Sequence, residues 1–260
     1  MKKYELTAES IVKFGRTLFR IKALVAFGNV EVGELGGFIE KEENLDQRGN
    51  AWVSGNARVF GNALVSDNAW VFGNALVSGN ARVFGNALVS DNAWVFGNAL
   101  VSDNAWVSGN ARVSGDAWVS GNAWVSGNAL VSDNAWVSGN ARVSDNAWVF
   151  GNALVSDKAQ VSGNAWVSDD ARVFKMSHYL VVGPLGSRDD FTTFFRTKHL
   201  TIGVKCGCFK GDTDEFFRAV EKTHRKNKHA QAYKAAIALA ESQIDLSEED
   251  SDEEETGKES

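Results

Sequence analysis

Small and apolar residues recur along the middle of the chain with a period of six. From Ala51 to Phe174 an alanine stands at every sixth position, twenty-one times, and a valine always follows it two residues later. The unit reads Ala-X-Val-(Ser/Phe)-(Gly/Asp)-Asn. Because side chains alternate between the two faces of a strand, this pattern predicts short strands with alanine and valine buried and the other two positions facing outward.

Each predicted strand ends in a corner. Gly or Asp follows the second outward residue, and Asn precedes the alanine at eighteen of the twenty-one positions. Glycine adopts positive φ without steric cost and asparagine tolerates it better than most residues, so these pairs favour turns. A six-residue unit cannot pair with itself, and successive coils must therefore stack with strands hydrogen-bonded one coil apart. Such stacking predicts ladders of identical Asn, Ala and Val side chains.

Segments such as Val-Ser-Asp-Asn-Ala-Trp-Val resemble the hexapeptide repeat of left-handed parallel β-helix proteins. The resemblance covers residues 51–174 and implies triangular coils of three hexads each. The repeat would then form about seven coils, roughly 34 Å in length at a strand spacing of about 4.8 Å. The predicted fold is mainly β, with a left-handed parallel β-helix over residues 49–174 whose handedness is implied by the resemblance alone.

Many proteins of this family are trimeric acyltransferases that use a catalytic histidine and loops protruding from the coils. This chain departs from that pattern, since no loop interrupts the repeat and all four histidines lie outside it: His178, His199, His224 and His229. Acyl transfer on the repeat would lack a general base for a substrate hydroxyl or amine. We therefore expect no catalytic residue in the repeat and no cofactor, and acyl transfer is the least favoured function.

The outward positions carry many large apolar side chains. The second outward position holds fifteen serines and six phenylalanines. The first holds six leucines, five arginines, one glutamine and nine tryptophans: Trp52, Trp70, Trp94, Trp106, Trp118, Trp124, Trp136, Trp148 and Trp166. Two interpretations are open. The rings stack along the faces and shield the thin core, or they form a surface for a partner protein or for self-association into a homo-oligomer.

A duplication within the repeat limits what one face can recognise. Residues 57–80 match residues 81–104 at every position except Gly79, which corresponds to Asp103. A shift of 24 residues is not a multiple of the 18 in a three-hexad coil, so Trp70 and Trp94 should lie on different faces. We therefore disfavour ice, saccharide or nucleic-acid recognition along a single face.

Residues 1–48 are predicted to cap the first coil. Residues 17–27 are strand-like, and Val32, Ile39 and Leu45 lead into the repeat at irregular spacings. An atypical terminal unit is expected, because an open solenoid end would expose its core and unpaired backbone groups. Gly-Glu-Leu-Gly-Gly-Phe-Ile at 33–39 resembles the leader of bacterial and phage hexapeptide-repeat proteins.

After Phe174 the repeat stops, and residues 175–244 predict a small α+β module. Strands are expected at 179–188, 191–195 and 200–209, followed by helices near 213–225 and 229–243. The module resembles one that recurs in the same phage-like proteins. Residues 245–260 contain nine acids and one lysine, and we expect them to form a disordered acidic tail.

The module supplies the candidate ligand-binding residues. An anion or nucleotide pocket is one hypothesis, formed by Ser187, Arg188, Thr192, Thr193, Lys205 and His224. A metal site is another, because Cys206 and Cys208 would project from one strand face, with His224 and His229 as further ligands. Against the metal site, these two histidines would point about 140° apart on a single helix. A polar turn and two half-buried strand cysteines would explain the same residues without any ligand.

Charge and cysteine content restrict the compartment and the partners. The formal net charge is −6, yet a basic cluster precedes the acidic tail: Lys222, His224, Arg225, Lys226, Lys228 and His229. Such a cluster could contact nucleic acid, although a solvated helix end is the more common role and we do not favour that partner. Two cysteines and the absence of an apolar run long enough to cross a bilayer favour a cytoplasmic protein without membrane contact.

Two functions therefore remain open. In the favoured one, the chain is a non-enzymatic β-solenoid scaffold that binds a partner protein or itself through apolar faces and holds its end modules rigidly. In the alternative, the C-terminal module binds a small ligand or nucleotide, or is an enzyme, and the solenoid is a spacer.

Overall fold

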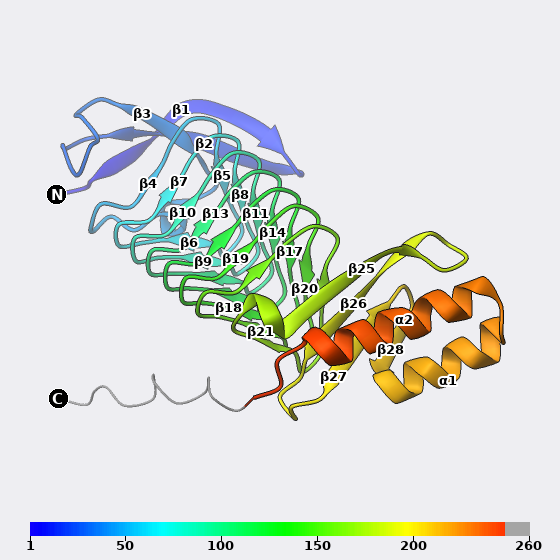
Figure 1. Ribbon diagram of the computed structural model, residues 1–260. Helices are drawn as coiled ribbons and strands as arrows, with labels where there is room; N and C mark the ends of the chain where they lie inside the picture. The colour runs from blue at the N-terminus through cyan, green and yellow to red at the C-terminus, as the bar shows by residue number, and fades with distance from the viewer. Residues whose placement is uncertain (248–260) are drawn as a thin grey trace.

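The computed structural model describes residues 1–247 and places an N-terminal β cap, a parallel β-solenoid and a small α+β module in line (Figure 1). The predicted acidic tail falls mostly on residues 248–260, which lie outside the described residues. Its first residues differ from the prediction, since the Asp245 N–H donates to the Ser177 carbonyl and Leu246 packs against the module's core. No helix within residues 1–247 is long and apolar enough to cross a membrane.

The repeat forms twenty-one two-residue strands, which pair in three parallel sheets, one for each face of the coil (Figure 1). Face 1 consists of β5 (Arg58–Val59), β8 (Leu76–Val77), β11 (Trp94–Val95), β14 (Arg112–Val113), β17 (Leu130–Val131), β20 (Trp148–Val149) and β23 (Trp166–Val167). Face 2 consists of β4 (Trp52–Val53), β7 (Trp70–Val71), β10 (Leu88–Val89), β13 (Trp106–Val107), β16 (Trp124–Val125), β19 (Arg142–Val143) and β22 (Gln160–Val161). Face 3 consists of β6 (Leu64–Val65), β9 (Arg82–Val83), β12 (Leu100–Val101), β15 (Trp118–Val119), β18 (Trp136–Val137), β21 (Leu154–Val155) and β24 (Arg172–Val173). Three hexads therefore make one coil, as predicted, and Trp70 and Trp94 lie on different faces.

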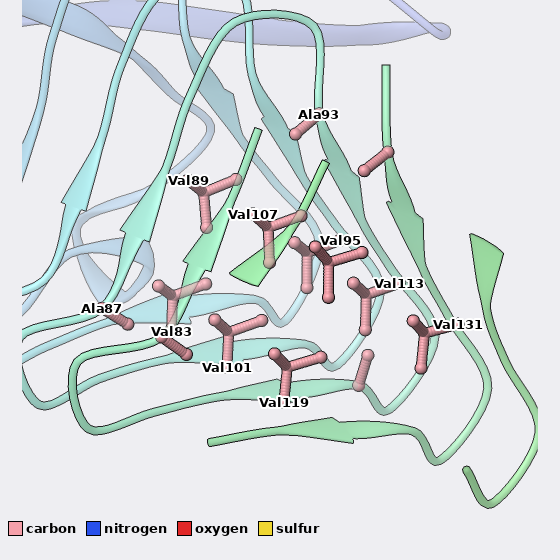
Figure 2. Close-up of a cluster of buried hydrophobic side chains, with 14 of the residues drawn as sticks. Val83, Ala87, Val89, Ala93, Val95, Val101, Val107, Val113, Val119 and Val131 are labelled. Carbon is pink, nitrogen blue, oxygen red and sulfur yellow. The ribbon is translucent and has the colours of Figure 1, made fainter. Parts of the chain in front are cut away.

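Alanine and valine fill the interior, which confirms the predicted inward face. All of the repeat's alanines and valines are at most 1% exposed. Figure 2 shows their side chains converging from the three faces on one narrow core. Backbone ladders hold the coils together, as where the Trp94 N–H donates to the Ala111 carbonyl at 2.9 Å. Burial of this apolar surface and pairing of the backbone groups stabilise the stack together.

Each corner has a left-handed residue, which is Gly, as expected from sequence, or Asp, whereas none of the corner asparagines adopts the positive φ that was also expected of them. Asp103, for example, has φ of 58°. Its carboxylate accepts the N–H of Gly121, one coil further on, at 3.0 Å. The neighbouring asparagines form the predicted ladder, in which Asn104 Nδ2 donates to Asn122 Oδ1 at 3.2 Å. Asp103 thus offsets an unfavourable backbone conformation with a hydrogen bond to the next coil.

The N-terminal cap continues the solenoid. Its strands β1 (Tyr4–Lys13), β2 (Arg16–Ala23) and β3 (Leu35–Ile39) join the sheet of face 1, and η1 (Glu42–Asn44) follows. Ile39 pairs with Val59 on face 1, and Leu45 forms a bridge with Val65 on face 3. Together with Val53 of β4 these residues supply the three sides of a first coil, so the solenoid has about eight turns.

The C-terminal module is an antiparallel sheet with two helices. A short helix η2 (Met176–His178) leads into β25 (Tyr179–Leu185), β26 (Asp190–Arg196), β27 (Ile202–Cys206) and β28 (Phe209–Asp212), then α1 (Thr213–His224) and α2 (Lys228–Gln243). The helices lie close to their predicted positions. The single strand predicted at 200–209 is instead the hairpin of β27 and β28, because residues 207–208 form a turn and Cys206 pairs with Phe209.

The module closes the open end of the solenoid. One face of β26 packs on the last coil, where Phe195 is 3% exposed and belongs to the solenoid's core. The Lys198 N–H donates to the Asp170 carbonyl at 2.9 Å, and the Lys198 ammonium pairs with the Asp170 carboxylate at 3.0 Å. The opposite face of the sheet packs on α1 and α2 through a second core that includes Phe194 and Phe216. The two cores therefore share one sheet.

Candidate functional site

The outer tryptophans stack along the solenoid faces. Three pairs are nearly parallel: Trp106 and Trp124 on face 2 with ring centroids 5.3 Å apart, Trp118 and Trp136 on face 3 at 5.1 Å, and Trp148 and Trp166 on face 1 at 5.1 Å. Arg112 lies over Trp94 at 5.2 Å in the same ladder position. Five indoles remain 37–41% exposed: Trp94, Trp106, Trp118, Trp136 and Trp148. Each ring face is thus covered mainly by its ladder neighbours.

The second outward position decides how an indole is held. Four indole N–H groups donate to a serine hydroxyl one coil earlier at 3.0–3.1 Å: Trp106 to Ser90, Trp118 to Ser102, Trp124 to Ser108 and Trp136 to Ser120. These serines are at most 5% exposed. Trp94 and Trp148, whose own rungs carry phenylalanine, instead meet Phe96 and Phe150 edge-on at 6.4 and 6.2 Å. Serine and phenylalanine are therefore packing partners of the tryptophans.

Trp52 does not belong to the predicted interaction surface. It is 1% exposed, because the cap covers it with Tyr4 and Phe27, whose rings meet it edge-on at 6.4 and 5.4 Å. Sequence position alone places Trp52 on an outer face, and only the chain path of the cap shows that the face is covered there. Trp166, at the other end, lies between Trp148 and the ammonium of Lys205, which is 5.6 Å from its ring centroid.

The structure divides the predicted ligand-binding residues between the two faces of the module's sheet. Thr193 and Lys205 are paired neighbours that face the solenoid. There the Thr193 hydroxyl oxygen accepts a hydrogen bond from the backbone N–H of Trp166 at 2.9 Å. Thr192 faces the helices and its hydroxyl donates to the sulfur of Cys206 at 3.2 Å. No single pocket can therefore contain the whole predicted set.

Arg188, Thr192, Cys206 and His224 do gather, around a residue that sequence reasoning missed. Tyr233 of α2 is 8% exposed, and its hydroxyl lies 3.9 Å from the sulfur of Cys206. The His224 ring is 5.7 Å from the Tyr233 ring. A Cβ on Gly207 would meet the guanidinium of Arg188, and a Cβ on Gly186 would overlap the Tyr233 hydroxyl. Gly186, directly before Ser187-Arg188, and Gly207, between the two cysteines, were the available signal of this close approach.

Burial and the nearby Cys206 raise the pKa of Tyr233 to about 12. The phenol is therefore neutral at physiological pH and acts through hydrogen bonding. The exposed guanidinium of Arg188 lies in the turn between β25 and β26, and the partly exposed His229 lies in the first turn of α2, with its ring 5.7 Å from that of His224. This arrangement can hold an anion at the surface above a buried, uncharged layer.

The expected metal ligands do not form one set. Cys206 is buried and Cys208 is exposed, because the strand ends at Cys206 and the turn points the second thiol to solvent. His224 and His229 are closer than predicted, since they belong to different helices that meet at the loop. Within residues 1–247 no group of three or more His, Cys, Asp or Glu side chains is arranged to hold a metal ion.

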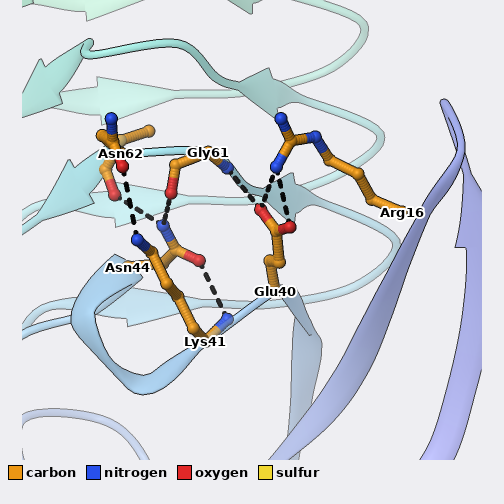
Figure 3. Close-up of polar contacts among 7 residues, drawn as sticks. Arg16, Glu40, Lys41, Asn44, Gly61 and Asn62 are labelled. Carbon is orange, nitrogen blue, oxygen red and sulfur yellow. Dashed lines mark hydrogen bonds and ion pairs between the residues drawn. The ribbon is translucent and has the colours of Figure 1, made fainter.

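A shallow groove of about 440 Å³ lies where the cap meets the first corner of face 1. Glu40 accepts hydrogen bonds from the Gly61 N–H at 2.6 Å and from Arg16 at 2.7 and 2.9 Å (Figure 3). Burial acts to raise the pKa of Glu40, but these hydrogen bonds and the Arg16 charge lower it overall. Asn44 donates to the carbonyls of Gly61 and Ala63 at 3.1 and 2.8 Å. The groove's polar groups thus join the cap to the coil.

Comparison with known proteins concerns the repeat. Seven segments match the model of the YdcK β-solenoid repeat: residues 51–67, 57–72, 81–96, 105–121, 123–139, 135–151 and 159–174. No curated protein matches the chain. The matched segments lie on the strands and corners that form the three faces. With its buried Ala/Val core, its eighteen-residue coil and these matches, the chain is a repeat β-helix protein, a β-solenoid whose repeats are similar to the YdcK β-solenoid repeat.

Proposed function

We propose that the chain is a non-enzymatic scaffold, a rigid β-solenoid that holds its N-terminal cap and its C-terminal module at a fixed separation. The observation that carries this proposal is the insertion of the module's Phe195 into the solenoid's own core. The segment that links the repeat to the module is short, since β24 ends at Val173 and β25 begins at Tyr179. Little chain is available for independent movement of the module.

Rigidity also follows from the bonding between coils. Each coil is tied to the next by backbone hydrogen bonds on three faces and by asparagine ladders at the corners. Bending the solenoid would open these bonds on one face. Tilting the module would expose Phe195 and leave the backbone N–H of Trp166 without an acceptor. Such a structure suits a spacer that fixes the relative position of two ends.

Distances between spin labels test the rigidity. One label is placed on Lys13→Cys in the cap and the other on the native Cys208, which is exposed, whereas Cys206 is buried. We expect a single narrow distance distribution in pulsed electron paramagnetic resonance. The matched control carries Cys208→Ser and two labels that do not involve the module, one on Lys13→Cys in the cap and one on Lys158→Cys in the solenoid. A clearly broader distribution for the module label than for the control would contradict the proposal.

The aromatic faces support self-association of this scaffold. A second copy is the occupant that fits best, because its coils repeat at the same axial spacing of about 4.8 Å and its side-chain ladders can interdigitate over several rungs. The exposed edges of Trp118 and Trp136 on face 3 are apolar, since their N–H groups are already bonded to serines. This pattern differs from that of a face built for polar recognition.

Light scattering tests the association. Replacing Trp118 and Trp136 by serine should lower the molar mass of the full chain toward that of a monomer. The pair Trp106→Ser and Trp124→Ser on face 2 is the matched comparison, because it is stacked in the same way. A chain that is monomeric before any substitution would rule out self-association and leave the rigidity proposal to be judged by the spin labels.

A further inference from the structure

We infer that the end of the C-terminal module farthest from the solenoid binds single-stranded nucleic acid through its phosphate backbone. Two loops form this end, the turn between β25 and β26 and the loop between α1 and α2 (Figure 1). The first of these loops packs closely against α2, because a Cβ on Gly186 would overlap the Tyr233 hydroxyl. The inference concerns a surface that the scaffold proposal does not use.

The charge of this end is strongly positive and is not neutralised locally. Lys222, Arg225, Lys226 and Lys228 are exposed. None of the four forms an ion pair with another of the described residues, and neither does Arg188. The adjacent acid Glu221 is bound to the Lys234 ammonium at 2.8 Å, so it does not offset them. Asp189 and Asp190 are the acids that follow Arg188, at the end of the turn and the start of β26. Cations outnumber acids on one small surface, which favours a polyanion.

Planar side chains lie beside these cations. The rings of His224 and His229 are 5.7 Å apart, and His224 is equally close to the Tyr233 ring. Arg188 adds a planar guanidinium from the other loop. Unpaired bases stack on imidazole and guanidinium groups, whereas bases in a duplex are already stacked on one another. The combination therefore fits a single strand better than a duplex.

An anionic membrane is a weaker fit for this surface. Helices that bind membranes place large apolar side chains beside their cations. The large exposed apolar residues of the described module are Met176, Phe217 and Leu239, and none belongs to the two loops at this end. Phe217 is also covered by the Lys234 ammonium, 4.6 Å from its ring centroid.

Fluorescence anisotropy with a labelled single-stranded RNA of mixed sequence tests the inference on the full chain. We expect binding that weakens on the order of tenfold or more when the salt concentration is raised fourfold. Lys226→Glu with Lys228→Glu should weaken binding at low salt by about tenfold or more. The matched control is Lys13→Glu with Lys158→Glu, two exposed lysines on the cap and solenoid with the same change in charge. This control should change the affinity by less than about twofold.

A second pair of variants separates stacking from charge and allows for the acidic residues 248–260. His224→Ala should weaken RNA binding without changing its salt dependence, because it removes a ring and not a fixed charge. A chain that ends at Ser247 lacks eight acids and should bind at least as tightly as the full chain.

Three outcomes would overturn the inference. The first is no binding by either the full chain or the chain ending at Ser247 at about 100 µM protein in low salt. The second is an equal loss of affinity in the control pair of lysine variants. The third is binding to vesicles rich in phosphatidylglycerol with no binding to RNA or single-stranded DNA, which would assign the surface to a membrane.

Discussion

The hydroxyl oxygen of Thr193 accepts the backbone N–H of Trp166 at 2.9 Å, at the point where a further coil would have offered a carbonyl. One coil earlier, the Trp148 N–H has such a carbonyl, that of Ala165, at 2.8 Å. A side chain of the module thus ends a backbone ladder of face 1. This contact explains why the solenoid can stop at this coil without leaving that donor unpaired.

Thr193→Val removes this acceptor while keeping the shape and the strand preference of the residue. The partly buried Trp166 N–H would lose its partner, and we expect a cost of about 1–3 kcal/mol in stability at that end. Hydrogen exchange of the last coil and the melting temperature should both report it. Thr223→Val on the exposed side of α1 is the control and should change neither. Unaltered exchange at Trp166 in Thr193→Val would show that the contact does not cap the ladder.

Corner glycines offer a test of how the coils stack. Gly115 and Gly163 have nearly equal φ, 70° and 67°. A Cβ on Gly115 would lie 2.8 Å from the backbone nitrogen of Asp133 in the next coil, whereas a Cβ on Gly163 would meet nothing within 4 Å. Gly163→Ala should therefore cost only the left-handed backbone penalty of about 1–2 kcal/mol, and Gly115→Ala clearly more. Chemical denaturation measures both. Equal losses would mean that the coils can separate to admit a methyl group.

The sequence predicted the solenoid well because each hexad has the same kinds of residue at its inward, outward and corner positions. Alternation placed Ala and Val inside, and the resemblance to the hexapeptide-repeat family implied the eighteen-residue coil that the strand pairs confirm. The module was predicted less completely, because its geometry depends on contacts between segments far apart in the sequence. Alternation shows that Thr192 and Thr193 face opposite ways, but not that the solenoid covers one of them and the helices the other.

Two local turns limited the prediction of the metal site. The two-residue turn after Cys206 is hidden within an apolar run, so the run reads as one strand with both cysteines on one face. The angle between His224 and His229 assumes a single helix, although the helices predicted near 213–225 and 229–243 already separate them, and Arg225 has φ of 52° at the break. In both places a turn contains a left-handed residue, Gly207 or Arg225, and only the glycine is a usual signal of one.

The bond between Trp136 and Ser120 predicts a small, specific contribution from the outer serines. Ser120→Ala would leave the Trp136 indole N–H without its acceptor at 3.1 Å, and we expect a loss of about 0.5–1.5 kcal/mol. Ser138→Ala on the same face is the matched control, because the residue sixteen positions later is Leu154, which has no N–H in its side chain to donate. Denaturation curves of the two variants should differ. If they coincide, the indoles are held by stacking alone.

The cap should become more stable as the pH rises from about 8 toward 10, because of the buried Lys3. Burial lowers the pKa of Lys3 from 10.5 to about 8, although the charge of Asp46 opposes the shift. Its amine donates to the Ala51 carbonyl at 2.9 Å beneath the cap. Between those two pH values the unfolded chain holds a proton on Lys3 that the folded chain has lost, so raising the pH favours the folded state.

A neighbouring group limits this gain at higher pH. Burial, together with nearby acids, raises the pKa of Tyr4 above that of an ordinary tyrosine. Once the pH passes about 10, the unfolded chain loses the Tyr4 proton that the folded chain keeps, and stability falls again. Melting temperatures across this pH range should therefore pass through a maximum in the native chain. Lys3→Met should lack the rise, whereas the exposed Lys13→Met should retain it. Only a residue that titrates differently in the folded and unfolded chain can make the melting temperature depend on pH. If the melting temperatures of Lys3→Met and the native chain change with pH in parallel, Lys3 is not the group responsible for the rise.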